Sequence, residues 1–87
     1  MEHVLIISPA FNSEKYIGQM LRSVQTQCHR FWTLVVIDDA SSDQTRQIVA
    51  SYSNEDNRIV LLPRATNAGR PSIPRNEGIA WAIDNKI

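Results

Sequence analysis

The chain has 87 residues, of which 43% are hydrophobic and 21% charged, enough for one small domain with a single core. Nine Lys and Arg residues balance nine Asp and Glu residues, so no overall field favours nucleic acid or an anionic membrane as partner. A single cysteine, Cys28, excludes an internal disulfide and a cysteine-based zinc site, and it favours a reduced, cytoplasmic setting.

The first strand is predicted at residues 4–7, where four apolar residues run together before Ser8 and Pro9. A continuous apolar run of this kind is typical of a strand buried on both faces of a parallel sheet, and it is too short for a membrane span. A helix is predicted from Ser13, with Glu14 in its first turn. Its apolar stripe consists of Ile17, Met20, Leu21 and Val24.

The second strand is predicted at residues 34–37. Ser41 and Gln44 have the spacing of a capping box, which predicts that a second helix begins there. Its inward residues are expected to be Ile48, Val49 and Tyr52.

The third strand is predicted at residues 59–62, before Pro63. Pro71 and Pro74 fit the first turn of a last helix, because backbone N–H groups there have no helical partner. The inward residues of that helix are predicted to be Ile79, Ala80 and Ile83.

Strands that alternate with helices predict right-handed βαβ units, and therefore an α/β fold with three βα units and a parallel, Rossmann-like sheet. Ligands of such sheets bind outside the carboxyl ends of the strands. The site is therefore expected in three segments that follow strands: SPAFNSE, DDASSD and PRATNAGRPSIPRN.

The first of these segments contains no glycine, which argues against a dinucleotide-binding turn or a P-loop, since both need backbone close to phosphate. It offers Phe11 instead, between Ala10 and Asn12. An aromatic ring at a strand end can pack against a nucleobase, or it can close the edge of the core. Both interpretations of Phe11 stay open on the sequence alone.

The second segment places Asp38 and Asp39 side by side at a strand end, so at least one carboxylate is expected to face the crevice. A carboxylate only accepts hydrogen bonds, which suits a ligand with ring N–H or hydroxyl donors. The other can cap the following turn. In the third segment Arg70 and Arg75 flank the start of the last helix, where an anion is favoured, whereas Arg58 and Arg64 are expected on solvated surface. An aromatic ring, a carboxylate and two arginines together suggest a nucleotide ligand.

Three longer segments cover essentially the whole chain: VLIISPAFNSEKYIGQMLRSVQTQ, LVVIDDASSDQTRQIV and NAGRPSIPRNEGIA. In order and spacing they resemble the N-terminal half of family 2 glycosyltransferases, which have the GT-A fold. The resemblance implies transfer of a sugar, with inversion, from a nucleotide-diphosphate donor, usually a UDP-sugar, to an acceptor hydroxyl. A receiver-like signalling domain, which the acidic pair also suggests, does not fit, because its carboxylates come from the ends of different strands.

The resemblance also implies roles for single residues. Pro9, Ala10 and Phe11 would form the wall of the nucleoside pocket, where the family more often has Tyr than Phe. Asp39 would accept a hydrogen bond from the uracil N3–H, with Asp38 turned elsewhere. The segment 67–76 would close over the base and the phosphates, with Arg70 or Arg75 as the cationic contact. Two prolines in RPSIPRN depart from the plain helical start that is usual in the family.

In the family a fourth strand follows, with an Asp-x-Asp motif that holds Mn²⁺ or Mg²⁺ against the diphosphate, and then the acceptor half with the catalytic base. Residues 1–87 are therefore expected to be a single partial domain without catalytic residues or a metal site, inactive alone. The parent is expected in the cytoplasm or at the cytoplasmic face of a membrane. Any association with the membrane is expected to depend on parts of the parent outside residues 1–87. A non-catalytic nucleotide-binding or assembly module derived from this fold is the alternative.

The first strand is expected to have a free edge, because the family places the fourth strand beside it. Unpaired N–H and C=O groups on an apolar strand are a template for pairing with another chain. The sequence therefore predicts self-association through this edge.

Overall fold

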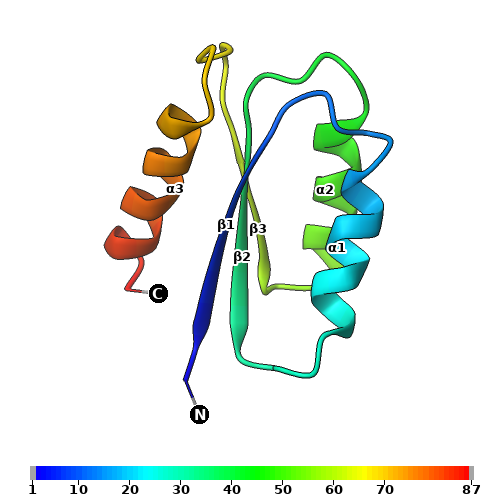
Figure 1. Cartoon of the computed structure of the whole chain (residues 1–87), viewed down its shortest axis with the longest axis vertical. Coiled ribbons are helices and arrows are strands. Elements are labelled where there is room, and N and C mark those ends of the chain that lie inside the picture. Colours follow the sequence, from blue (N-terminus) through cyan, green and yellow to red (C-terminus); the bar gives the residue numbers. More distant parts are fainter. Residues whose placement is uncertain (1, 87) are drawn as a thin grey trace.

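The computed structural model describes residues 2–86 and has six elements in strict alternation (Figure 1). The three strands are β1 (Val4–Ala10), β2 (Trp32–Asp38) and β3 (Ile59–Pro63). The three helices are α1 (Ile17–Thr26), α2 (Thr45–Glu55) and α3 (Ser72–Asp84). The predicted α/β fold with a parallel, Rossmann-like sheet is confirmed.

The sheet has the order β1-β2-β3, with both pairs of strands parallel. Strand β2 lies in the middle, and all seven of its residues are buried, because the sheet flanks it on both edges and helices cover both faces. The strands are longer than predicted. Small and polar residues such as Ser8 and Thr33 extend the ladder, since register with a buried partner strand decides their conformation.

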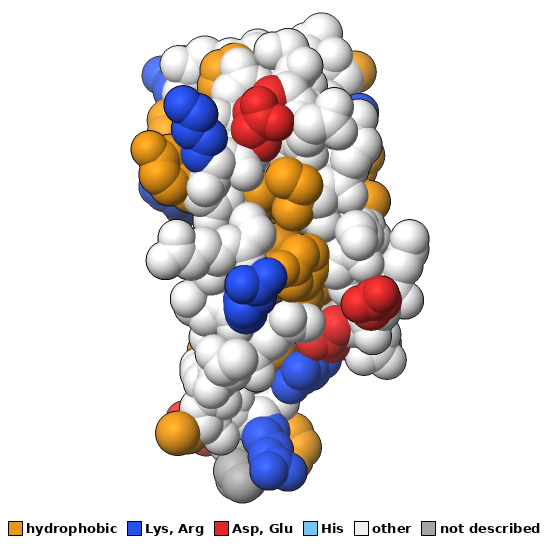
Figure 2. Space-filling model, turned by 90° about the vertical axis from the view of Figure 1, so that its right-hand side faces the viewer, with side chains coloured by type: hydrophobic (Ala, Val, Ile, Leu, Met, Phe, Trp, Pro, Cys, Tyr) orange, Lys and Arg blue, Asp and Glu red, His pale blue; other side chains and the backbone are white. Residues whose placement is uncertain are grey.

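Three layers form the molecule: α1 and α2 cover one face of the sheet and α3 covers the other (Figure 1). The core between the sheet and α1 and α2 includes Leu21 and Val49, both fully buried against Leu34 and Val36 of β2. On the outer face of these helices, apolar side chains show only as separate areas among charged and polar ones (Figure 2). Within residues 2–86 no helix is both long and apolar enough to cross a membrane.

Helix α3 turns a different side to the sheet than predicted. Its buried residues are Pro74, Gly78 and Ala82, whereas Ile79 and Ile83 are 41% and 71% exposed. The prediction of an inward Ile79, Ala80 and Ile83 was therefore wrong. The side of α3 that faces the sheet carries small residues because the helix lies very close to β2. A Cβ atom on Gly78 would come within 2.6 Å of Ile37 Cδ1.

The predicted starts of the first two helices also need correction. Helix α1 begins at Ile17, after a turn, so Glu14 lies outside its first turn. Helix α2 begins at Thr45 without a side-chain cap from Gln44. The Ser41 hydroxyl accepts instead from the backbone N–H of Asn12, which ties the loop after β2 to the loop after β1.

Candidate functional site

An open pocket of about 430 Å³ lies where β1 and β2 end and α3 begins. The six residues predicted to form the site all line it: Pro9, Ala10, Phe11, Asp39, Arg70 and Arg75. Four further residues, which belong to the segment between β3 and the first turn of α3, complete the wall: Asn67, Gly69, Pro71 and Pro74. The fold thus brings together all the predicted residues, while their binding role stays a prediction.

Strand β1 supplies the apolar wall of the pocket. Pro9 and Ala10 are its last two residues and pair with Ile37 and Asp38 of β2. Phe11 follows directly and is 50% exposed at the pocket. Because half of its surface is open, Phe11 does not close the core. The ring is therefore accessible at the pocket, and its contact with a nucleobase stays a prediction.

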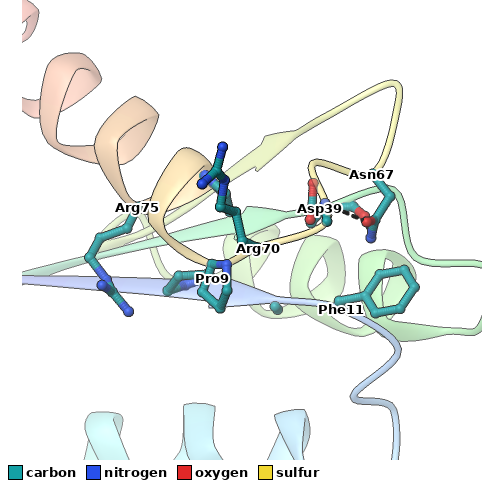
Figure 3. Close-up of a pocket in the computed structure, with 10 residues that line it drawn as sticks. Pro9, Phe11, Asp39, Asn67, Arg70 and Arg75 are labelled. Carbon is teal, nitrogen blue, oxygen red and sulfur yellow. Dashed lines mark hydrogen bonds between the residues drawn. The ribbon is translucent and has the colours of Figure 1, made fainter.

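Asp39 is fixed at the pocket wall by hydrogen bonds from three directions. Its backbone N–H donates to the Ala10 carbonyl (2.8 Å), and its carbonyl accepts from Asn67 Nδ2 (3.1 Å; Figure 3). The backbone N–H of Ala68 donates to both carboxylate oxygens, at 2.9 Å to Oδ1 and 3.1 Å to Oδ2. The carboxylate is therefore oriented before any ligand arrives.

Arg64, just after β3, forms an ion pair with Asp39. Its Nη1 lies 2.7 Å from Asp39 Oδ1, and its Nε lies 3.0 Å from Glu77 Oε2 on α3. The Arg64 side chain is only 18% exposed, so the prediction of a solvated surface arginine was wrong. The hydrogen bond to Asp39 raises the pKa of Arg64 above its ordinary value. The sequence held one signal for this contact, the need of two adjacent carboxylates for opposite charge.

Asp38 does not line the pocket and instead binds residues of the turn and helix that follow β2. Its Oδ2 accepts from Arg46 Nε at 2.9 Å and from the backbone N–H of Ser41 at 3.3 Å. The side chain is fully buried. Asp38 thus stabilises the turn into α2. The family resemblance implied the same, because it expected the Asp38 side chain to point away from the ligand.

Arg70 and Arg75 give the pocket its positive charge. Both are exposed, and in the described part of the chain neither forms an ion pair. In Figure 3 the Arg75 guanidinium and the Phe11 ring lie at opposite ends of the drawn residues. The start of α3 adds the positive end of a helix dipole. The pocket therefore combines an aromatic ring, two arginines and one carboxylate in its lining.

The loop before α3 is shaped by its glycine and asparagine. Gly69 has a φ of 82°, a left-handed conformation that only glycine adopts without strain. Its N–H donates to Asn67 Oδ1 at 2.7 Å. Pro71 then precedes α3 and Pro74 lies in its first turn, as predicted. The two prolines are therefore compatible with a regular helix start.

A parallel α/β sheet with a pocket at its carboxyl edge that is lined by apolar residues, two arginines and one carboxylate defines a Rossmann-like ligand-binding domain. The family model for glycosyl transferase family 2 matches residues 5–85. The chain therefore belongs to glycosyltransferase family 2.

Among curated relatives, the chain is 42% identical over 79 residues to the poly(ribitol-phosphate) beta-N-acetylglucosaminyltransferase TarS of Staphylococcus aureus, with 88% of this chain and 14% of TarS covered. It is 39% identical over 79 residues to the UDP-Glc:alpha-D-GlcNAc-diphosphoundecaprenol beta-1,3-glucosyltransferase WfgD of Escherichia coli, with 91% of this chain and 30% of WfgD covered. The chain thus spans less than a third of either relative.

Two solved structures share the fold. The crystal structure of S. aureus TarS 1-349 in complex with UDP matches with a TM-score of 0.81 and 40% identity, over 94% of this chain and 24% of that one. The mannosyltransferase PcManGT from Pyrobaculum calidifontis in complex with GDP-Man and Mn2+ matches with a TM-score of 0.82 over 92% of this chain and 24% of that one. At 23% identity the second match concerns the fold alone.

Proposed function

We propose that this chain is the donor-binding part of an enzyme that transfers a sugar from a UDP-sugar to an acceptor hydroxyl. The observation that carries the proposal is one pocket that gathers Phe11, Asp39, Arg70 and Arg75. The choice of UDP is supported by two relatives, since the TarS crystal structure holds UDP and the name of WfgD gives UDP-Glc.

In this proposal each wall of the pocket binds a different part of the donor. The Phe11 ring stacks on the base, which is a favourable contact for any nucleobase face. Asp39 accepts from the uracil N3–H, because its Oδ2 receives one hydrogen bond from the described part of the chain and keeps an acceptor position for the base. Arg70 and Arg75 face the diphosphate, whose charge they and the start of α3 offset.

Titration calorimetry with UDP tests the pocket directly. We expect wild-type protein to bind UDP and Phe11→Ala to bind it about 5- to 150-fold more weakly, because base stacking on an aromatic ring contributes about 1–3 kcal/mol. Asp39→Asn should lose binding as well, because its amide nitrogen would face Arg64 or the base. Asp84→Asn, an exposed change at the far end of α3, is the matched control. Equal binding by all four proteins would refute the pocket assignment.

The metal and the catalytic base are proposed to come from parts of the relatives that lie outside this match. Within residues 2–86, no group of three or more His, Cys, Asp or Glu side chains is placed to hold a metal ion. We therefore assign no metal-dependent step to these residues, and expect Mn²⁺ or Mg²⁺ to be held by the longer parent. Sugar transfer by the 87-residue chain above a blank reaction would contradict this division.

A non-catalytic nucleotide-binding module remains the second candidate, favoured by the same lack of a metal cluster among the described residues. The two candidates differ in the parent protein. A parent with an Asp-x-Asp motif that turns over UDP-sugar is the enzyme, and one that binds UDP without turnover is the module. A cytoplasmic location is proposed for both, because Cys28 is an exposed free thiol.

Self-association through β1 is also part of the proposal. Within the described residues β1 pairs only with β2, on one edge. The Val4 N–H donates to the Phe31 carbonyl, so alternate N–H groups, including that of Leu5, point to the free edge. Light scattering at tens of micromolar should show assemblies that Leu5→Pro reduces, because proline removes a donor that points to the free edge and none that bonds to β2. A strict monomer would refute this part.

A further inference from the structure

We propose that Arg64 determines which base the pocket accepts. It does so by occupying one oxygen of Asp39, which leaves the other as an acceptor for a base with a single ring N–H donor. This inference rests on the proposed function, because it concerns the carboxylate that would bind the base. Arg64 does not line the pocket, so it acts as a positioning residue through Asp39.

The two oxygens of Asp39 are unequal. Oδ1 accepts from Arg64 Nη1 at 2.7 Å and from the Ala68 N–H at 2.9 Å. Among residues 2–86, Oδ2 accepts only from the same Ala68 N–H, at 3.1 Å. A carboxylate oxygen has two lone pairs, so Oδ1 is saturated and Oδ2 keeps one free acceptor position. The side chain is 8% exposed, and that small opening is at the pocket.

Both the side chain and the main chain of Arg64 are held in place beside Oδ1. Its Nε donates to Glu77 at 3.0 Å, so the guanidinium is fixed from both sides. Its backbone N–H donates to the Asp38 carbonyl at 2.8 Å, and its carbonyl accepts from Arg46 Nη2 at 3.0 Å. Main chain and side chain are thus both anchored.

Bases differ in the number of donors that they present to such a carboxylate. Uracil presents one, N3–H, between two carbonyl oxygens. Guanine presents two neighbouring donors, N1–H and the 2-amino group, which would need both carboxylate oxygens. Cytosine and adenine present a ring acceptor, which a carboxylate repels. With Oδ1 saturated, the second guanine donor would be buried without a partner, which weakens binding about tenfold or more.

Inosine diphosphate gives a test that is matched in size to GDP. Its base lacks the 2-amino group and presents a single N1–H. Calorimetry on the 87-residue wild-type chain should show UDP as the tightest ligand and inosine diphosphate bound about tenfold tighter than GDP. This comparison needs no variant, so it stands even where a substitution prevents folding.

Variants then assign the effect to Arg64. In Arg64→Met, Oδ1 regains a lone pair, and GDP should bind at least as tightly as inosine diphosphate. Glu77→Gln keeps the contact between Arg64 and Asp39 and should keep the wild-type preference. A merely structural role of Arg64 would weaken all three nucleotides equally and leave their ratio unchanged.

The possible failures are distinct. Equal binding of GDP and inosine diphosphate by wild type, with UDP bound, would overturn the inference and leave the proposed function standing. A preference that persists in Arg64→Met would overturn the role of Arg64. Absence of UDP binding by folded wild-type protein would overturn the proposed function itself.

Discussion

Arg46 Nε and Nη2 both lie 2.9 Å from one oxygen of Asp38, Oδ2. Arg46 is the second residue of α2 and Asp38 ends the central strand, so this contact anchors α2 to the sheet. The neighbouring Asp39 has its own arginine, Arg64. Two adjacent carboxylates are therefore compatible with burial because each forms an ion pair with its own arginine.

Removal of Arg46 should destabilise the protein through the carboxylate left behind. In Arg46→Met, fully buried Asp38 would lose its cation, and loss of one partner of a buried pair is costly. Since Arg46 is itself 41% exposed, we expect a loss of about 2 kcal/mol in the free energy of unfolding, measured with urea. Asp38→Asn in the same background should recover part of it. A loss below about 0.5 kcal/mol would contradict this role.

These ion pairs show which contacts the sequence could not predict. Asp38 and Asp39 were identifiable as a pair that needs cations, but Arg46 and Arg64 are 8 and 25 residues away from their partners. Only the packing of α2 and of the segment after β3 selects them. By contrast, Pro9, Phe11, Arg70 and Arg75 were predictable as pocket residues, because parallel strands and the helices that follow them bring such segments to one edge.

The fold shows the same division. The three strands could be predicted from apolar runs, because a parallel strand that is buried on both faces consists of nearly continuous apolar residues. The inward side of α3 was not predictable from apolar periodicity, since a close helix–sheet contact at Gly78 selects small residues and leaves Ile83 outside. The capping box at Ser41 failed for a similar reason, because its hydroxyl bonds to a loop distant in sequence.

Acid should weaken the protein partly through Asp56. The side-chain hydrogen bond from Arg58 lowers the pKa of Asp56 to about 2, from 3.8. A lowered folded-state pKa means that the stabilisation is full above pH 3.8 and is lost as the pH falls through about 2. A shift of this size is equivalent to about 2 kcal/mol, which screening of the 36% exposed Arg58 reduces to about 1 kcal/mol.

Urea unfolding at several pH values between 7 and 2 measures this contribution. Asp56→Asn should be less stable than wild type at pH 7 and should approach it at the acid end. Glu55→Gln, an exposed neighbour on α2, should follow the wild-type curve. Parallel curves for wild type and Asp56→Asn would rule out the linkage.

The close packing of α3 on the sheet predicts different costs for two similar substitutions. Gly78→Leu would force a side chain into Ile37 and Ile7 of the sheet, where a Cβ alone would lie 2.6 and 3.1 Å from their nearest atoms. We expect a loss of about 1–3 kcal/mol in the free energy of unfolding, as for other overpacked cores. Ala80→Leu on the exposed side of the same helix should change stability by no more than about 0.5 kcal/mol. Equal effects would mean that α3 presents another side to the sheet.

Ala40, the residue after the pocket residue Asp39, has a strained backbone conformation. It has a φ of 61°, a left-handed conformation that costs an L-residue about 1–2 kcal/mol. We expect Ala40→Gly to be at least as stable as wild type and Ala40→Val to be less stable by about 1 kcal/mol or more, because a β-branched residue fits this region worst.

The same pair of variants should separate in UDP binding, measured by calorimetry. A valine that pulls residue 40 out of the left-handed region would move the neighbouring Asp39 carboxylate away from Ala68 and Arg64, whereas glycine leaves it in place. Ala65→Val, an exposed loop substitution at ordinary φ, controls for added bulk. If glycine and valine at position 40 gave equal stability and equal UDP affinity, the turn after β2 would not hold the carboxylate in the way described.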